Sequence, residues 1–272
     1  MRKKRKRWNH KFKKIRKKTT RMHKKRRKKL GFSFRLLFIA VILSLVMPAS
    51  AWDFANELKT SIWHLIDFSP VHVSNSELAE LEYNGVDQVM VVNHNMAEFT
   101  EEELSLNDGS WQTFSDLDGY NRVGVANAML SQTLMPSEPR ESLYVNPTGW
   151  KNKQITRGDV TNWLYNRCHL IGFQLTGENN NLKNLMTGTR SLNTPHMLQY
   201  ENKVASYIKE TNHHVRYRVE PIFRDNELVA RGIHMQAQSI EDDQINFNIY
   251  IFNIEEGVII DYTDGSSKTV TK

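Results

Sequence analysis

The sequence is poor in cysteine, and its first 51 residues lack acidic side chains; each absence excludes a class of protein. A single cysteine, Cys168, in 272 residues rules out a disulfide scaffold and a cysteine-ligated zinc finger. Residues 1–51 contain 20 lysines and arginines and no aspartate or glutamate. The rest of the chain carries 17 basic and all 30 acidic residues, a net charge of −13. The calculated pI of 9.3 therefore describes the leader and does not indicate a basic DNA-coating protein.

The leader, residues 1–51, has the three parts of an export signal. Residues 2–29 hold 19 lysines and arginines, residues 36–47 form an apolar run, and the small residues Ala49-Ser50-Ala51 follow Pro48. This order is typical of a cleaved secretory signal peptide. The alternative is an uncleaved membrane anchor, because the uncharged stretch 36–52 has 17 residues, the short end for a spanning helix. Both interpretations place the body extracellularly, secreted or anchored, because basic flanks stay in the cytoplasm.

The body has the composition of a folded protein, with 39% hydrophobic residues in the chain. We expect a helical N-terminal segment at 52–77 and one main domain at 78–272. Residues 194–210 have the apolar spacing of an amphipathic helix, whereas residues 215–223 and 245–254 alternate as strands do. The pattern predicts the α+β class, an antiparallel sheet with packed helices.

The charge of the body is uneven along the chain. Residues 140–190 contain seven basic and three acidic residues, and this basic island surrounds His169. Substrates that carry phosphates need local positive charge, and distant acidic groups are screened at physiological salt. The alternative is a chance excess of basic residues on a solvated surface.

Two pairs of adjacent residues, each with a histidine, suggest chemistry that the geometry of the chain disfavours. Cys168-His169 resembles a thiol nucleophile beside its base, and His213-His214 resembles half of a metal site. Adjacent residues of a strand point to opposite faces, so neither pair can converge on one substrate or ion.

The segment from 179 to 193 is rich in asparagine. Its asparagines are Asn179, Asn180, Asn181, Asn184 and Asn193. Asparagine favours turns, but its amide oxygen also binds hard cations such as Mg²⁺. Glu201 follows Asn193 by eight residues. If a helix begins near Thr194, these two residues lie about 12 Å apart along its axis, so Glu201 would reach a shared ion only through metal-bound water.

An ordered set of residues resembles a known family. Asn166-Arg167-Cys168-His169-Leu170, followed by Asn184, Asn193 and Glu201, resembles the DNA/RNA non-specific endonucleases, whose usual motif is Asp-Arg-Gly-His or a variant such as Asn-Arg-Ser-His. The stretches 93–99 and 117–150 are similar to the streptococcal secreted and DNA-entry nucleases. The resemblance covers about residues 78–262.

The resemblance implies an active site built on a ββα-metal finger. His169 would be the general base, and Asn193 the single protein ligand of Mg²⁺, with Mn²⁺ as the alternative ion. Glu201 would act on the ion through water, and Arg167 would face the scissile phosphate or its leaving group.

The same resemblance extends to supporting residues. Asn184 would hold the loop, and Asn166 replaces the more usual aspartate as a structural support. Cys168 stands where the family has a small glycine or serine. From the basic island, we further expect Arg190 and Lys183 to bind phosphate or substrate.

The sequence therefore predicts an exported endonuclease without sequence preference, with residues 78–272 as its nuclease domain and DNA, or also RNA, as its substrate. One alternative is a catalytically inactive surface protein for DNA binding or uptake. Another is a surface adhesin without a nucleic-acid role. The membrane is a partner only if the leader stays uncleaved, and no oligomeric state is predicted.

Overall fold

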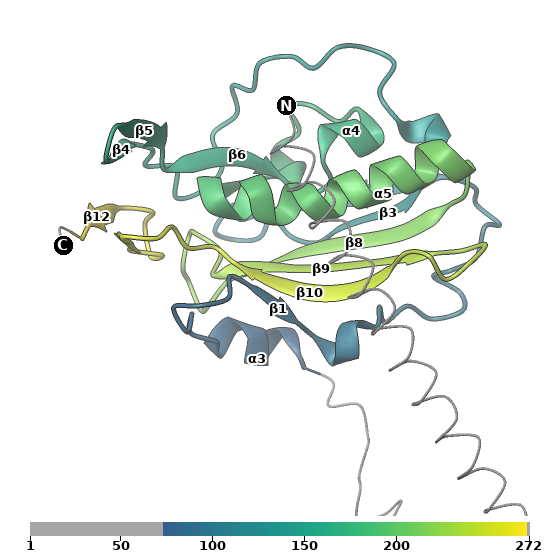
Figure 1. Cartoon of the computed structure of the whole chain (residues 1–272), viewed down its shortest axis with the longest axis horizontal. Coiled ribbons are helices and arrows are strands. Elements are labelled where there is room, and N and C mark those ends of the chain that lie inside the picture. The colour runs from purple at the N-terminus through teal and green to yellow at the C-terminus, as the bar shows by residue number, and fades with distance from the viewer. Residues whose placement is uncertain (1–72, 271–272) are drawn as a thin grey trace, which may run out of the picture. The chain divides into compact units, whose positions relative to one another are not determined.

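The computed structural model describes residues 73–270. The expected leader and most of the segment at 52–77 lie outside the described residues. Within residues 73–270, no helix combines the length and the apolar character needed to cross a bilayer. The described residues form a six-stranded antiparallel sheet with packed helices (Figure 1), so the predicted α+β class is confirmed.

The main sheet joins strands that are distant in sequence. Its order is β1-β10-β9-β8-β3-β2, with every neighbouring pair antiparallel. The strands are β1 (Val89–Val91), β2 (Trp111–Phe114), β3 (Ala126–Leu130), β8 (Val215–Ile222), β9 (Gly232–Ser239) and β10 (Asn246–Phe252). The predictions at 215–223 and 245–254 thus correspond to β8 and β10.

Helix α5 (Leu198–Thr211) covers one face of this sheet (Figure 1). Its buried Val204 and Ile208 belong to the same apolar cluster as Tyr217 of β8 and Phe247 of β10. Burying such side chains contributes about 1.5–3 kcal/mol each, so this contact fixes the helix on the sheet.

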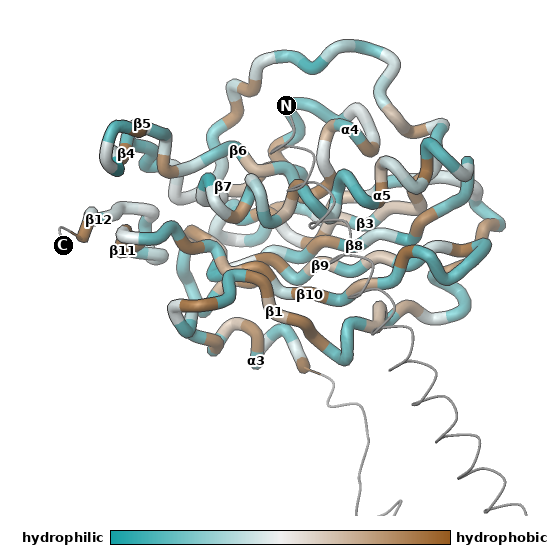
Figure 2. Tube along the Cα trace, viewed as in Figure 1, coloured by the Kyte–Doolittle hydropathy of each residue, from teal (hydrophilic) through white to brown (hydrophobic). Residues whose placement is uncertain are grey.

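The opposite face of the sheet is covered by a shorter helix. Helix α3 (Asn75–Glu80) begins with a reciprocal pair of hydrogen bonds between Ser74 and Glu77, and its Leu78 packs with Tyr250. The alternation in β10 predicted one buried and one polar face, but six of its seven residues are buried. Both faces are buried because helices cover both sides; Figure 2 shows the hydrophobic stretches along β1 and β10.

A two-stranded sheet followed in the chain by α5 forms a ββα unit. Strand β6 (Tyr165–His169) pairs with β7 (Leu185–Thr189), and helix α4 (Phe173–Thr176) lies between them in sequence. An irregular helical segment, Leu192–Met197, then leads into α5.

The start of α5 differs from the prediction. The expected helix began at residue 194, but the regular helix begins at Leu198. Proline restricts the residue before it to extended conformations, and Thr194 before Pro195 has φ −145° and ψ 117°. The chain therefore bends at Thr194.

Two small hairpins and several single turns complete the described residues. One hairpin pairs β4 (Gln154–Arg157) with β5 (Val160–Trp163), and the other pairs β11 (Val258–Ile260) with β12 (Ser267–Thr269). Short helical turns occupy Asn93–Asn95, Gln132–Leu134 and Leu182–Asn184.

Candidate active site

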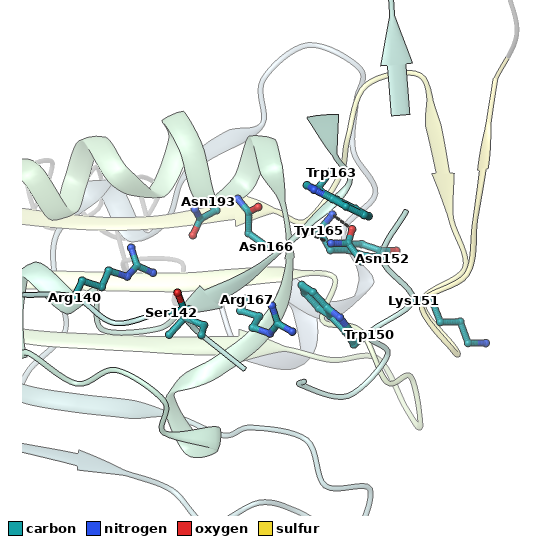
Figure 3. A pocket seen from close by; sticks show the side chains of 11 residues that line it. Arg140, Ser142, Trp150, Lys151, Asn152, Trp163, Tyr165, Asn166, Arg167 and Asn193 are labelled. Atoms are coloured by element: carbon teal, nitrogen blue, oxygen red, sulfur yellow. Dashed lines mark hydrogen bonds between the residues drawn. The ribbon is translucent and has the colours of Figure 1, made fainter. Parts of the chain in front are cut away.

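An open cleft of about 870 Å³ runs along β6 (Figure 3). Its lining residues are Arg140, Ser142, Leu143, Trp150, Lys151, Asn152, Trp163, Tyr165, Asn166, Arg167 and Asn193. Three of these residues are cationic and none is acidic, although the body as a whole is acidic. The three cations come from the basic island of residues 140–190, so the cleft suits an anionic ligand.

Arg167 is held rigidly on the wall of this cleft. Its Nε donates to the Val145 carbonyl at 2.6 Å, and Nη2 donates to Asn146 Oδ1 at 2.7 Å. Its guanidinium lies 4.7 Å from the ring centroid of Trp150. These contacts fix the guanidinium plane and leave Nη1 without a protein acceptor among the described residues, so an N–H of Arg167 is available to a phosphate.

His169, the last residue of β6, is not among the residues that line the cleft, and it is 6% exposed. Its Nε2 lies 2.8 Å from the Asn179 carbonyl oxygen. A carbonyl oxygen only accepts hydrogen bonds, so Nε2 carries the proton and Nδ1 the lone pair. Burial, together with the charge of Arg140, lowers the pKa of His169, and the ring is neutral at pH 7.

Asn193 lines the cleft from the irregular segment before α5. Its Nδ2 donates to Thr194 Oγ1 at 3.2 Å. The Oδ1 atom has no protein donor among the described residues, so it can accept from, or coordinate, a ligand in the cleft. Asn166 of β6 lines the same cleft, and Figure 3 shows the two amides together.

Glu201, in the first turn of α5, is buried at 8% exposure and is not part of the cleft lining. Burial raises the pKa of its carboxyl to about 7, whereas Arg140 and a hydrogen bond from the Gly172 amide lower it. The carboxylate lies directly against Gly172, where a Cβ atom would overlap it. A carboxyl with this pKa can gain or lose a proton near neutral pH.

Asn184 holds the chain segment that follows His169. It is fully buried; its Oδ1 accepts from the Ile171 amide at 2.9 Å and its Nδ2 donates to the Ile171 carbonyl at 3.0 Å. The Leu170 amide also donates to the Asn184 carbonyl at 2.9 Å. These three bonds tie the end of β6 to the loop before β7.

The two expected phosphate-binding residues lie outside the lining of the cleft. Lys183 pairs with Asp116, with Nζ 2.6 Å from Oδ1, and Arg190 has an exposed side chain. Their role in substrate binding stays a prediction.

Arg140 is a residue of the site that no sequence motif indicated. It is exposed, lines the cleft, and its charge lowers the pKa of both His169 and Glu201. Arg140 therefore links the cleft electrostatically to the two buried groups. The only sequence signal for it is its place at the start of the basic island, because the motif residues begin at Asn166.

The donor set of the site fits a hard divalent cation. An amide oxygen without a protein donor, at Asn193, is a ligand type that Mg²⁺ accepts, and Mg²⁺ keeps several waters when protein ligands are few. The buried Glu201 carboxyl is an acceptor suited to such waters. Asn193 and Glu201 are therefore the groups that would hold the ion.

Comparisons with known proteins concern the family and the fold. A family model described as DNA/RNA non-specific endonuclease matches residues 104–241. The fold is similar to that of NucA from Streptococcus agalactiae with a magnesium ion bound, with a TM-score of 0.61, 24% identity, and coverage of 71% of this chain and 91% of that chain.

Two further solved structures are similar. NucA from Streptococcus agalactiae with no metal bound has a TM-score of 0.61 and 26% identity, over 74% of this chain and 99% of that chain. The Sda1 nuclease with a bound zinc ion has a TM-score of 0.52 and 26% identity, over 58% of this chain and 81% of that chain. These matches confirm the resemblance inferred from the residues around His169.

Proposed function

The chain belongs to the DNA/RNA non-specific endonuclease family, and on that basis we propose that it is an exported, Mg²⁺-dependent enzyme in which His169 is the general base. As a member of this family it hydrolyses phosphodiester bonds of nucleic acids without sequence preference. The observation that carries the proposal is the contact between His169 Nε2 and the Asn179 carbonyl, because a carbonyl only accepts and Nδ1 is therefore left as an acceptor.

His169 is in the form that a general base requires at neutral pH. With its pKa lowered by burial, the imidazole is unprotonated and Nδ1 takes a proton from the attacking water. The Asn179 carbonyl holds the ring in orientation during that transfer and stabilises the imidazolium that results. This is the role that an orienting acceptor has beside other catalytic histidines.

The cleft wall would hold the phosphate. Arg167, fixed by Val145 and Asn146, offers Nη1 to a non-bridging oxygen, and the exposed Arg140 supplies a second positive charge. Contacts of this kind address the backbone rather than the bases, which is consistent with cleavage at any sequence.

Asn193 Oδ1 would bind the cation directly, and Glu201 would accept from its waters. The bound ion would stabilise the negative charge that develops on the phosphate and on the leaving oxygen. Asn184 and Asn166 would support the ends of the ββα unit. Mn²⁺ is the alternative ion, and two similar structures hold a magnesium ion and a zinc ion.

Export is supported by the leader composition. The run of 19 lysines and arginines at 2–29, followed by the apolar residues 36–47, would direct the nuclease domain out of the cell, secreted or anchored.

Plasmid cleavage tests the proposal. The purified chain is incubated with supercoiled DNA in Mg²⁺, Mn²⁺, Zn²⁺ or EDTA, beside the variants His169→Ala and Asn193→Ala. We expect His169→Ala to lose at least about 100-fold in rate, the lower end for an acid–base group. Added imidazole should partly restore a His169→Gly variant, because the small base can enter the vacated space.

Three results would overturn parts of this proposal. Equal digestion by the wild-type chain and by His169→Ala would show that His169 is not the general base. Digestion in EDTA would show that cleavage does not require a metal ion. Salt-sensitive DNA binding without strand breaks in any divalent ion would instead indicate a surface DNA-binding protein.

A further inference from the structure

Trp163, the last residue of β5, presents an uncovered aromatic ring to the cleft. The residue is 53% exposed, and its side chain lies on the cleft wall beside Tyr165 and Asn152 in Figure 3. Among the described residues, Trp163 has no partner ring and no cation over its face. Trp150 differs, because the Arg167 guanidinium lies 4.7 Å from its ring centroid and the Tyr165 ring 6.5 Å away.

The backbone that carries Trp163 is firmly held. Trp163 pairs with Gln154 across the β4–β5 hairpin, and the next amide, of Leu164, donates to the Lys153 carbonyl at 2.9 Å. Asn152 then makes two hydrogen bonds to the backbone of Tyr165, at 2.8 and 3.0 Å. The ring is therefore open to solvent on a fixed scaffold, which lowers the entropic cost of binding a flat ligand to it.

The surroundings of this ring suit a nucleotide. The same cleft contains Arg140 and Arg167 and no acidic side chain, and its volume of about 870 Å³ is within the range of ligand sites. A positively charged groove with an accessible aromatic face is the combination by which proteins hold single-stranded nucleic acid, the phosphates on the cations and a base on the ring.

We propose that Trp163 stacks on a nucleobase of a single-stranded or locally unpaired segment, next to the phosphate held in the cleft. This subsite rests on the proposed nuclease function and adds a substrate preference to it. Within a duplex, each base face is covered by its neighbours, and a base reaches a protein ring only after costly unstacking. Trp163 therefore favours single-stranded substrates over duplexes of the same sequence.

Steady-state cleavage of a labelled oligonucleotide, single-stranded or annealed to its complement, tests this preference in the full-length chain with Mg²⁺. The variants are Trp163→Ala, Trp163→Phe and, as a control, Tyr120→Ala, which removes a ring of 52% exposure that is not part of the cleft lining. We expect Trp163→Ala to lower kcat/KM on the single strand about 5- to 100-fold, the range of one base–aromatic stack, mostly through KM. On the duplex its effect should be under about threefold, and Trp163→Phe should retain most of the preference because it keeps a ring.

A spectroscopic measurement reads the same contact without catalysis. In EDTA, a single-stranded oligonucleotide should quench more tryptophan fluorescence in the wild-type chain than in Trp163→Phe. An abasic oligonucleotide of equal length carries the same phosphates without bases, and it should abolish that difference.

The outcomes separate this subsite from the nuclease assignment. If the wild-type chain cleaves nothing in any divalent ion while the base-dependent quenching is present, the proposed function fails and the stacking site stands. If the wild-type chain cleaves normally, two results overturn the stacking site and leave the nuclease assignment in place. Either Trp163→Ala has the wild-type kcat/KM on single strands, or its loss of kcat/KM is as large on duplexes as on single strands. Quenching that is equal with abasic and ordinary oligonucleotides also overturns it.

Discussion

The carboxylate of Glu201 lies against the Cα of Gly172, so that residue 172 has no space for a side chain. Gly172 has φ −60° and ψ 145°, which any residue can adopt. Close approach to Glu201, rather than backbone conformation, therefore requires glycine here. Because Gly172 lies three residues after His169, this contact joins the chain segment after His169 to α5.

Gly172→Ala should displace the Glu201 carboxylate rather than unfold the chain, because the atoms in the way are the end of a side chain that can rotate. We expect a 10- to 100-fold loss of cleavage rate, about the range for disturbed outer-shell groups of metal sites. In a Glu201→Ala background, Gly172→Ala should lower the cleavage rate little further, since the two changes remove the same contact. Gly119→Ala is the matched control, because nothing lies within 4 Å of its Cβ position. An equal effect of Gly172→Ala in both backgrounds would show that it acts elsewhere.

Burial of Glu201 makes the stability of the chain depend on pH. With the pKa raised from 4.5 to about 7, the folded chain stabilises the protonated carboxyl; this stability is fully present below pH 4.5 and is lost as the pH rises through 7. Glu201→Gln keeps the shape without the charge, so its stability relative to wild type should increase by about 3 kcal/mol between pH 4.5 and 8. Urea unfolding of both chains in EDTA measures this difference. A difference that is constant with pH would mean that the carboxyl is solvated.

The sequence predicted the elements whose pattern is local. Alternation identified β10, and apolar spacing identified α5, because both follow from the period of the backbone. The start of α5 was wrong by four residues, although Pro195 marks the bend, because the apolar spacing continues through it. Burial of both faces of β10 was not predicted, because it depends on α3, a helix distant in sequence.

The site was predictable only where residues form a motif. The set around His169 matches a family pattern, whereas Arg140 and Trp163 lie in segments without one. The loop that follows Arg140 meets β6 through tertiary contacts such as the hydrogen bond from Arg167 to the Val145 carbonyl, which joins residues 22 apart. A loop such as this one has no period from which a contact can be inferred, and Trp163 ends a strand of only four residues.

The pH dependence of cleavage should depend on the charge of Arg140, because this charge lowers the pKa of His169. The kcat/KM profile should retain activity below pH 6.5, because burial and Arg140 lower the pKa of His169 and only its unprotonated form is a base. Arg140→Gln removes a nearby positive charge, so this pKa should rise and the acid limb should move to higher pH. Arg190→Gln, outside the cleft lining, is the control and should leave the limb in place. An unchanged limb in Arg140→Gln would exclude the coupling.

The loop after the base depends on one amide side chain. Asn184→Ala leaves the Ile171 amide and carbonyl without their side-chain partners in a fully buried place, which should cost about 2–5 kcal/mol of unfolding free energy. Asn202→Ala removes an exposed side-chain amide that, within residues 73–270, bonds to Gln174 alone, and its effect should stay within about 0.5 kcal/mol. Denaturant unfolding of the two variants gives the comparison. Because the lost bonds hold the end of β6, Asn184→Ala should also lower the cleavage rate at temperatures where it is still folded. Full stability together with a normal rate would show that the backbone alone holds His169 in position.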